Sequence, residues 1–306
     1  MSVDVPGAQA PRKLLVLTYH RILEAEDPLR PGEMTREAFE RHTGVLRRFF
    51  NVLPLAQAWQ RTRAGTLPRR AVAITFDDGY ADNAELALPI LVRQGLTASF
   101  FVATSFLDGG RMWNDTIIET VRRAPARVDL EDLGAGTLLP GDTESRTAAA
   151  TRLIRAWKHL PPAERQSRVD ELARRAGVQP PTNLMMRSDQ VRALAQAGMT
   201  VGSHTVTHPI LAKIDDAEAE REMRESRTRL ESITGEPVTL FAYPNGRLGD
   251  DYEPRHAEIA RRVGFELALS TDPGMVERGS DPYRLPRFGP WSEAAWRFGA
   301  RLLQRY

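Results

Sequence analysis

Short, nearly continuous apolar runs alternate along this chain with longer stretches in which apolar residues recur at helical spacing. The apolar runs are rich in β-branched or aromatic residues, which is typical of parallel strands covered on both faces. They are Leu14–Thr18, Ala71–Phe76, Ala98–Ala103, Thr200–Gly202, Thr239–Ala242 and Leu267–Leu269. The helical stretches are Arg36–Phe50, Ala84–Gln94, Ser188–Ala197, Asp215–Thr234 and Pro254–Val263. This alternation predicts a parallel α/β fold.

Glycines mark the ends of several predicted helices, and one long region departs from the pattern. Gly95, Gly198 and Gly264 each follow a helical stretch directly, as expected for helix C-caps. Residues 108–182 carry glycine, proline and charge, with helical patterning in Trp113–Arg123 and Thr147–Ala176. We interpret this region as a partly helical insertion built on one catalytic domain that spans residues 1–306, a length that suits a single α/β barrel.

Charge and cysteine content narrow the range of functions. The 42 basic and 40 acidic residues nearly cancel and are spread along the chain, so we expect no nucleic-acid partner. The chain has no cysteine, which excludes thiolate metal sites and cysteine nucleophiles. Any bound metal must therefore use nitrogen and oxygen ligands.

The start of the chain is polar and carries only a brief apolar run, at residues 14–17. That run is too short for the apolar part of a signal peptide and far too short to span a membrane. We therefore expect no transmembrane segment and a cytoplasmic location.

Two adjacent carboxylates follow the second predicted strand, in the run Thr75-Phe-Asp-Asp-Gly-Tyr80. Adjacent residues of a regular strand point to opposite faces, so a strand alone could not direct both side chains to one site. Gly79 allows a turn through which Asp77 and Asp78 can converge at the barrel mouth, where α/β barrels keep their active sites. An ordinary turn or helix-initiating aspartate pair is the alternative.

Two histidines follow a later strand, in Gly202-Ser-His-Thr-Val-Thr-His208-Pro209. Imidazoles four positions apart on a helical turn can present two nitrogens to one divalent ion. With one carboxylate from elsewhere, such a pair leaves coordination positions open for water and substrate. A lone histidine here would more often be structural, but the paired spacing favours a metal site.

Together, the two motifs resemble the first two signature motifs of the polysaccharide deacetylase family, also called the NodB-homology or carbohydrate esterase 4 family. The resemblance extends from Leu14 to about Phe288. It implies a distorted (β/α)7-type barrel, with Asp77 as general base and with Asp78, His204 and His208 as metal ligands. Independent chemistry agrees, because a divalent ion acidifies water and polarises a carbonyl while a nearby carboxylate removes the proton.

The third motif of the family departs from its usual Arg-x-Pro-Tyr form. The matching stretch is Phe241-Ala-Tyr-Pro-Asn-Gly246, in which Ala242 stands in place of the arginine and Asn245 in place of the tyrosine. The resemblance implies that the backbone N–H of Asn245 stabilises the oxyanion and that Tyr243 contributes to substrate binding. This form is typical of a subgroup acting in exopolysaccharide synthesis. The alternative is a plain Pro-Asn-Gly turn after a strand.

The histidine that many family members use as general acid, in a C-terminal Leu-x-x-His motif, is missing. The equivalent region reads Tyr283-Arg-Leu-Pro-Arg-Phe288, and we expect Arg287 to orient Asp77 in place of the arginine absent from the third motif. We favour His20, at the end of the first strand, as the general acid. The first and last strands of a closed barrel are neighbours, so His20 can occupy the space that the missing C-terminal histidine would have filled. This resembles the subgroup whose acid histidine lies on the N-terminal strand. A structural role for His20 is the alternative.

The remaining aromatic and histidine residues give weaker signals. Trp113 in the insertion is a candidate wall of a sugar-binding groove, although tryptophan is more often part of a core. His42, His159 and His256 lie in charge-rich helical stretches, and we expect them to face solvent.

These observations predict a metal-dependent hydrolase that removes N-acetyl groups from N-acetylhexosamine units of an oligo- or polysaccharide, or of its precursor, and releases acetate. Zinc is the expected cofactor, while Co²⁺, Ni²⁺ and Mn²⁺ suit the same ligands. One alternative keeps the metal site but acts on a non-sugar amide or an O-acetyl ester. Another is a non-catalytic carbohydrate-binding protein that retains the fold.

Overall fold

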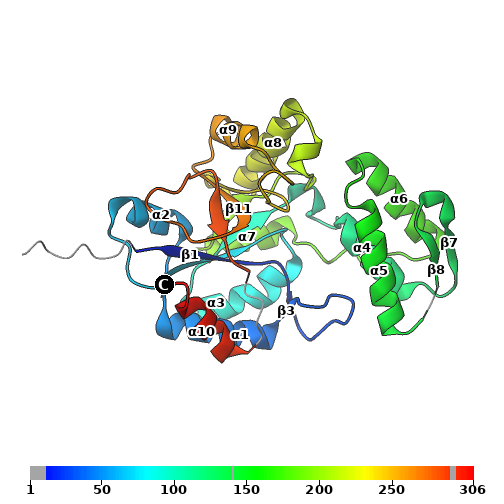
Figure 1. The fold of residues 1–306 in the computed structure, drawn as a ribbon, viewed down its shortest axis with the longest axis horizontal. Helices are drawn as coiled ribbons and strands as arrows, with labels where there is room; N and C mark the ends of the chain where they lie inside the picture. The colour runs from blue at the N-terminus through cyan, green and yellow to red at the C-terminus, as the bar shows by residue number, and fades with distance from the viewer. Residues whose placement is uncertain (1–11, 140, 290–293) are drawn as a thin grey trace, which may run out of the picture.

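The computed structural model describes residues 12–139, 141–289 and 294–306, and its main feature is a parallel sheet curled into a barrel (Figure 1). Helices cover the outer face of this sheet. In spatial order the barrel strands are β1 (Leu14–Tyr19), β5 (Ala71–Phe76), β6 (Ser99–Val102), β9 (Thr200–Ser203), β10 (Leu240–Ala242), β11 (Leu267–Pro273) and β12 (Leu285–Arg287). The predicted α/β fold with a distorted (β/α)7-type barrel is confirmed.

Shorter strands lie beside this barrel. The two-residue strand β4 (Asn51–Val52) pairs with β5 outside the spatial order of the barrel, and β2 (Ile22–Leu23) pairs with β3 (Met34–Thr35) in a small separate sheet.

The barrel closes through backbone hydrogen bonds between the first strand and the end of the last. Thr18 N–H donates to the Phe288 carbonyl at 3.0 Å, and Phe288 N–H donates to the Val16 carbonyl at 2.8 Å. Two other strand pairs are irregular, because β9 and β10 share a single paired position and the β11–β12 register shifts between Leu269 and Pro273. These irregularities account for the distorted shape.

Side chains alternate between the barrel interior and the helix-covered outside. Val72, Ile74 and Phe76 pack outward in the largest hydrophobic cluster, whereas Ala71 and Ala73 pack in a separate cluster with interior residues of the other strands. The same period of two continues past the strand end and directs Asp77 inward.

In the described parts of the chain, seven α-helices surround this barrel. They are α1 (Arg36–Phe49), α2 (Leu55–Ala64), α3 (Leu88–Gln94), α7 (Ser188–Gln196), α8 (Asp216–Thr234), α9 (Pro254–Val263) and α10 (Ala295–Leu303). A turn of π-helix at Asn83–Ala87 leads into α3. In the parts of the chain that the structure describes, no helix is both long and apolar enough to cross a membrane.

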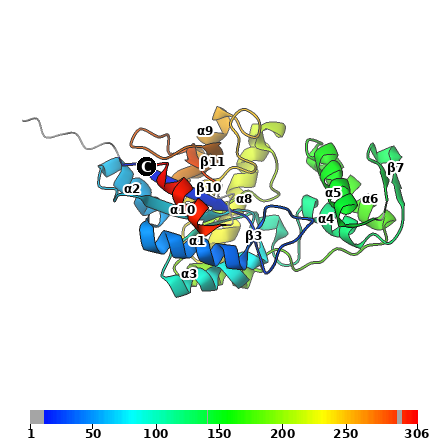
Figure 2. The same cartoon turned by 60° about the horizontal axis from the view of Figure 1, so that its bottom comes forward.

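Two of the three histidines expected to face solvent are buried instead. The ring of His42 stacks on Phe298 with a centroid distance of 3.8 Å, which docks α10 against α1 (Figure 2). His256 accepts a hydrogen bond from Glu253 N–H at 2.8 Å and so caps the start of α9. The expectation is wrong for these two because each lies on the apolar face of its helix, whereas His159 is exposed.

The insertion forms a lobe beside the barrel (Figures 1 and 2). It consists of α4 (Trp113–Arg123), the hairpin β7 (Val128–Leu130) and β8 (Gly136–Leu138), α5 (Thr143–Trp157) and α6 (Pro162–Arg175). These elements enclose their own hydrophobic cluster, in which Trp157 is fully buried. The helical pattern of Thr147–Ala176 corresponds to two helices, α5 and α6. Helical structure stops at residues 158–161, because Pro161 and Pro162 interrupt helical hydrogen bonding.

A loop of the barrel holds the first helix of this lobe. Arg30, between β2 and β3, pairs with Asp115 at 3.0 Å and with Glu119 at 2.8 Å, and both carboxylates lie on α4. The neighbouring Leu29 packs in the hydrophobic cluster of the lobe. This contact fixes the start of α4, and with it Trp113, relative to the barrel.

Gly202 leaves room for an aromatic ring inside the barrel, and its replacement should therefore destabilise the fold. A Cβ at this position would lie 2.6 Å from two ring atoms of Phe101. We expect Gly202→Ala to lower the free energy of unfolding by about 1–3 kcal/mol, as overpacking of a core does. The measurement is the midpoint of urea-induced unfolding followed by circular dichroism.

Gly44→Ala in α1 is the matched control. A Cβ there meets nothing within 4 Å, and alanine is the better helix former, so its midpoint should stay level or rise. A Gly202→Ala midpoint at or above that of the parent protein would contradict this packing argument.

Candidate active site

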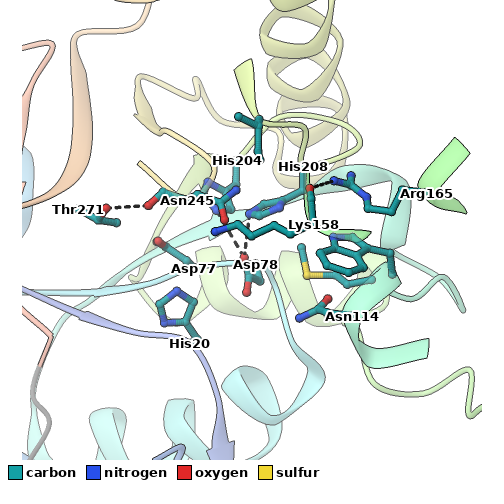
Figure 3. A pocket seen from close by; sticks show the side chains of 13 residues that line it. His20, Asp77, Asp78, Asn114, Lys158, Arg165, His204, His208, Asn245 and Thr271 are labelled. Atoms are coloured by element: carbon teal, nitrogen blue, oxygen red, sulfur yellow. Dashed lines mark hydrogen bonds and ion pairs between the residues drawn. The ribbon is translucent and has the colours of Figure 1, made fainter. Parts of the chain in front are cut away.

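The loops that follow four barrel strands converge on one pocket at the carboxyl ends of the sheet (Figure 3). Helices of the insertion form its opposite wall. The pocket has a volume of about 180 Å³ and is lined by His20, Asp77, Asp78, Met112, Trp113, Asn114, Lys158, Arg165, His204, His208, Ile210, Asn245 and Thr271.

Asp78, His204 and His208 form a cluster that fits a divalent ion. One Asp78 carboxylate oxygen lies 3.4 Å from Nε2 of His204 and 3.4 Å from Nε2 of His208. The candidate ligand atoms all lie within 4.8 Å of one another. Ligands of a tetrahedral zinc ion, each about 2.1 Å from the metal, are separated by about 3.4 Å. The donor set and its spacing therefore suit such an ion.

Contacts behind the ligands fix their orientation. Nδ1 of His204 lies 2.7 Å from the Ala242 carbonyl, which leaves Nε2 facing Asp78. The loop that carries His208 is held by Glu222 of α8, whose carboxylate accepts hydrogen bonds from the N–H groups of Val206 and Thr207 at 2.7 and 2.8 Å. Much of the ligand geometry is thus set before any ion binds.

Three residues of the pocket adopt backbone conformations that non-glycine residues rarely occupy. The φ angle is 75° at Asp78, 53° at His208 and 58° at Asn245. Such strain persists only where the surroundings hold the backbone firmly, and it is concentrated at functional sites. At Asp78 this turn lets consecutive aspartates direct both side chains into one pocket.

The electrostatics of the cluster favour an ionised carboxylate and a neutral imidazole. Burial alone would raise the pKa of Asp78, but hydrogen bonding to His204 and the charge of His208 lower it well below its usual range. Burial lowers the pKa of His208 to about 4, and the charge of His204 acts in the same direction. Asp78 and His208 thus have the protonation states that bind metals. Burial would lower the pKa of His204, but its hydrogen bond to Asp78 and the charge of Asp77 raise it, so this imidazole gives up a proton when it binds an ion.

Asp77 has a different partner. Its two carboxylate oxygens accept hydrogen bonds from both terminal nitrogens of Arg287, each at 2.7 Å, and both side chains are buried. Nε of Arg287 donates to the Ser270 carbonyl at 2.8 Å. Burial acts to raise the pKa of Asp77, but the guanidinium outweighs it and holds this pKa below its usual range. Asp77 therefore remains an anion beside the cluster without joining it.

The structure brings His20, Asn245 and Trp113 to the same pocket. His20 is exposed at the end of β1 and lies beside Asp77 in Figure 3. The Asn245 carbonyl accepts a hydrogen bond from the Thr271 hydroxyl at 2.6 Å, which holds the turn after β10. Trp113 begins α4 at the insertion wall.

Tyr243 is not brought to the pocket, which corrects the expectation that it binds substrate. Its side chain is fully buried on the outer side of the barrel, stacks on Tyr252 at 3.9 Å, and donates a hydrogen bond to the Tyr283 carbonyl. The reason is strand alternation, since Ala242 faces the interior and the next residue must face away.

Sequence reasoning missed several residues of the site. Lys158 and Arg165 line the pocket from the insertion, and Glu222 supports the histidine loop. The pair Pro161-Pro162 is a signal that could have revealed the bend carrying Lys158 and Arg165. Glu222 lies within a long amphipathic helix, where no local pattern distinguishes it.

The comparisons with known proteins agree with this geometry. The model of the polysaccharide deacetylase family matches residues 64–130 and 151–268, more than half of the chain. YxkH of Bacillus subtilis (strain 168) is 21% identical over 281 residues, which cover 91% of this chain and 72% of that protein.

Two solved structures illustrate the shared fold. The Streptococcus pyogenes deacetylase PplD in complex with acetate is 19% identical, with a TM-score of 0.64 over 97% of this chain and 99% of that one. IcaB from Ammonifex degensii is 21% identical, with a TM-score of 0.58 over 94% and 97% of the two chains. The Asp77–Asp78 pair, His204 and His208 all fall within the matched segments of the sequence. The chain belongs to the polysaccharide deacetylase family.

Proposed function

We propose that this protein is a metal-dependent hydrolase that removes N-acetyl groups from N-acetylhexosamine units of a polysaccharide, or of its precursor, and releases acetate. One observation carries the proposal. A pocket at the barrel mouth combines a three-ligand nitrogen and oxygen cluster with a second carboxylate, Asp77, that belongs to a separate ion pair. Family membership supports the same chemistry.

Asp78, His204 and His208 would hold the ion, and we propose zinc, with Co²⁺, Ni²⁺ and Mn²⁺ as ions that suit the same donors. A bound divalent ion supplies Lewis acidity, which polarises an amide carbonyl and acidifies water. Three protein ligands leave coordination positions on the ion open for the amide carbonyl and for water.

The other pocket residues have distinct roles in the proposal. Asp77, kept ionised by Arg287, removes the proton from the attacking water, and Arg287 fixes the direction of its carboxylate. His20, which lies beside Asp77 in the pocket, donates a proton to the leaving amine. The backbone N–H of Asn245 stabilises negative charge on the carbonyl oxygen, and Trp113 provides an apolar face for a sugar ring.

The size of the pocket suits an acetamido group with part of one sugar, while the rest of a glycan lies outside. The third-motif form around Asn245 favours a substrate from exopolysaccharide synthesis. The cytoplasmic location remains a prediction, and there a lipid-linked or oligomeric precursor would be the accessible substrate.

Metal content and acetate release test the proposal directly. Protein loaded with zinc should release acetate from N-acetylglucosamine oligomers, lose this activity with a chelator, and regain it when zinc is restored. His204→Ala or His208→Ala should remove the metal, because each deletes one of three protein ligands. Elemental analysis measures the metal.

The other substrate classes are assayed in parallel. Preferred turnover of O-acetyl esters or small non-sugar amides would favour the first alternative function. Glycan binding that is equal with and without metal, accompanied by no turnover, would favour a binding protein. Stoichiometric metal in either histidine variant would contradict the ligand assignment.

Asp77→Asn and His20→Gln test the acid and base roles. Each variant should keep its fold and its metal while kcat falls by roughly 10²-fold or more, the usual contribution of a general acid or base. Circular dichroism and elemental analysis accompany the kinetics. A near-normal rate for His20→Gln would mean that another group supplies the proton.

Replacing Arg287 should shift the pH dependence in a defined direction. The guanidinium lowers the pKa of Asp77 against the effect of burial, so its removal raises that pKa. Because the base acts when ionised, the acidic limb of the kcat/KM profile of Arg287→Met should move to higher pH. Arg287→Lys retains a positive charge and should shift less. An acidic limb in the same place for all three proteins would contradict the role of Arg287.

A further inference from the structure

Two basic side chains from the insertion face the candidate catalytic cluster. Lys158 lies at the end of α5, and Arg165 lies in the first turn of α6, on either side of the bend at Pro161-Pro162. Both line the same pocket as Asp78 and His208. In Figure 3 the Lys158 side chain extends into the pocket from the insertion, and the Arg165 guanidinium lies on the side of His208.

Arg165 differs from the other buried arginines. Arg21 and Arg287 each contact a carboxylate at 2.8 Å or less, and Arg30 contacts three. Arg165 is only 6% exposed, yet no carboxylate within residues 12–139, 141–289 and 294–306 lies within ion-pair distance of it. Lys158 likewise forms no ion pair with the residues in these ranges. Two cations at the pocket therefore lack a counter-ion from the described protein.

The contacts that hold Arg165 leave most of its hydrogen-bonding capacity unused. Among the described residues, its side chain donates one hydrogen bond, to the Lys158 carbonyl at 3.1 Å, and it lies over the Trp113 ring at 4.8 Å from the centroid. A guanidinium has five N–H donors. Burial lowers the pKa of Arg165, and no nearby carboxylate opposes this effect. A buried charge without a partner is costly, so such a site favours an anionic ligand.

The remaining charges of the pocket reinforce this preference. Arg287 already neutralises Asp77, and a divalent ion would more than neutralise Asp78. Lys158 and Arg165 then add positive charge that no acidic side chain of the pocket offsets. A neutral chain of N-acetylhexosamines would leave both cations without partners, whereas a substrate with a negative group could pair with them.

We propose that Arg165 and Lys158 form a subsite for a carboxylate or phosphate group attached next to the N-acetylhexosamine that is deacetylated. This inference rests on the proposed function and specifies its substrate as an acidic glycan. Arg165 can hold either anion with two parallel hydrogen bonds, while Lys158 adds a point charge. Trp113, beneath the guanidinium, keeps the fork in place.

Matched substrates separate the two sources of the anion. For the carboxylate, tetrasaccharides of alternating glucuronic acid and N-acetylglucosamine are compared with the N-acetylglucosamine tetrasaccharide. For the phosphate, N-acetylglucosamine 1-phosphate is compared with N-acetylglucosamine. We expect the zinc-loaded protein to show a kcat/KM about 10- to 100-fold higher for the acidic member of one pair, the usual effect of a hydrogen bond to a charged group. Added salt should reduce this preference.

Variants connect the preference to the two side chains. Arg165→Gln and Lys158→Gln should each bring the acidic-to-neutral ratio of kcat/KM towards one, and Arg165→Lys should retain part of it. Arg155→Gln is the matched control, because Arg155 is exposed on α5 and outside this pocket, so the ratio should not change. If circular dichroism shows that Arg165→Gln misfolds, Lys158→Gln, at a partly exposed helix end, provides the test.

The outcomes distinguish this inference from the proposed function. Equal kcat/KM for acidic and neutral members of both pairs, or ratios unchanged by Arg165→Gln and Lys158→Gln, would overturn the subsite while the deacetylase proposal stands. If no substrate releases acetate, the proposed function fails. In that case, calorimetric titration with the same tetrasaccharides tests the subsite. If the subsite exists, the acidic tetrasaccharide binds more tightly than the neutral one, and Lys158→Gln removes that difference.

Discussion

The buried ion pair between Arg287 and Asp77 is the interaction on which the rest of the site depends. Arg287 belongs to the last barrel strand and Asp77 follows the second, so their contact reaches across the interior past β1. The pair helps to hold the two ends of the sheet together, and it keeps one carboxylate ionised in a place where burial would favour its neutral form. The same ion pair therefore helps to close the barrel and keeps the proposed base ionised.

Much of the site could be predicted because it follows from strand ends. Asp77 and His204 each come directly after an apolar run, and parallel strands bring such positions to one edge of the sheet. The same rule, applied one residue further, would have excluded Tyr243, since Ala242 already faces the interior. That prediction failed because it relied on a motif position and not on strand alternation.

The remaining features depend on contacts between segments far apart in the sequence. Glu222 holds the loop before His208 through two backbone N–H groups, which any residue could provide, and through the Thr207 hydroxyl. A threonine in a loop has many possible partners, so the loop sequence does not identify Glu222. The positive φ of Asp78 is likewise imposed by its surroundings, because aspartate alone would not favour it. Lys158 and Arg165 were missed because charged residues in amphipathic helices usually face solvent. Only the tertiary arrangement turns Arg165 inward.

The insertion encloses a hydrophobic cluster of its own, apart from those of the barrel. Substitutions inside that lobe can reshape one wall of the pocket while the strands that carry Asp78 and His204 keep their packing. Under the proposed function, selectivity for the glycan and the capacity to hydrolyse it thus reside in structurally separate parts. In evolution, or in the laboratory, selectivity can be changed by exchanging the lobe while the barrel residues that carry out hydrolysis stay unchanged.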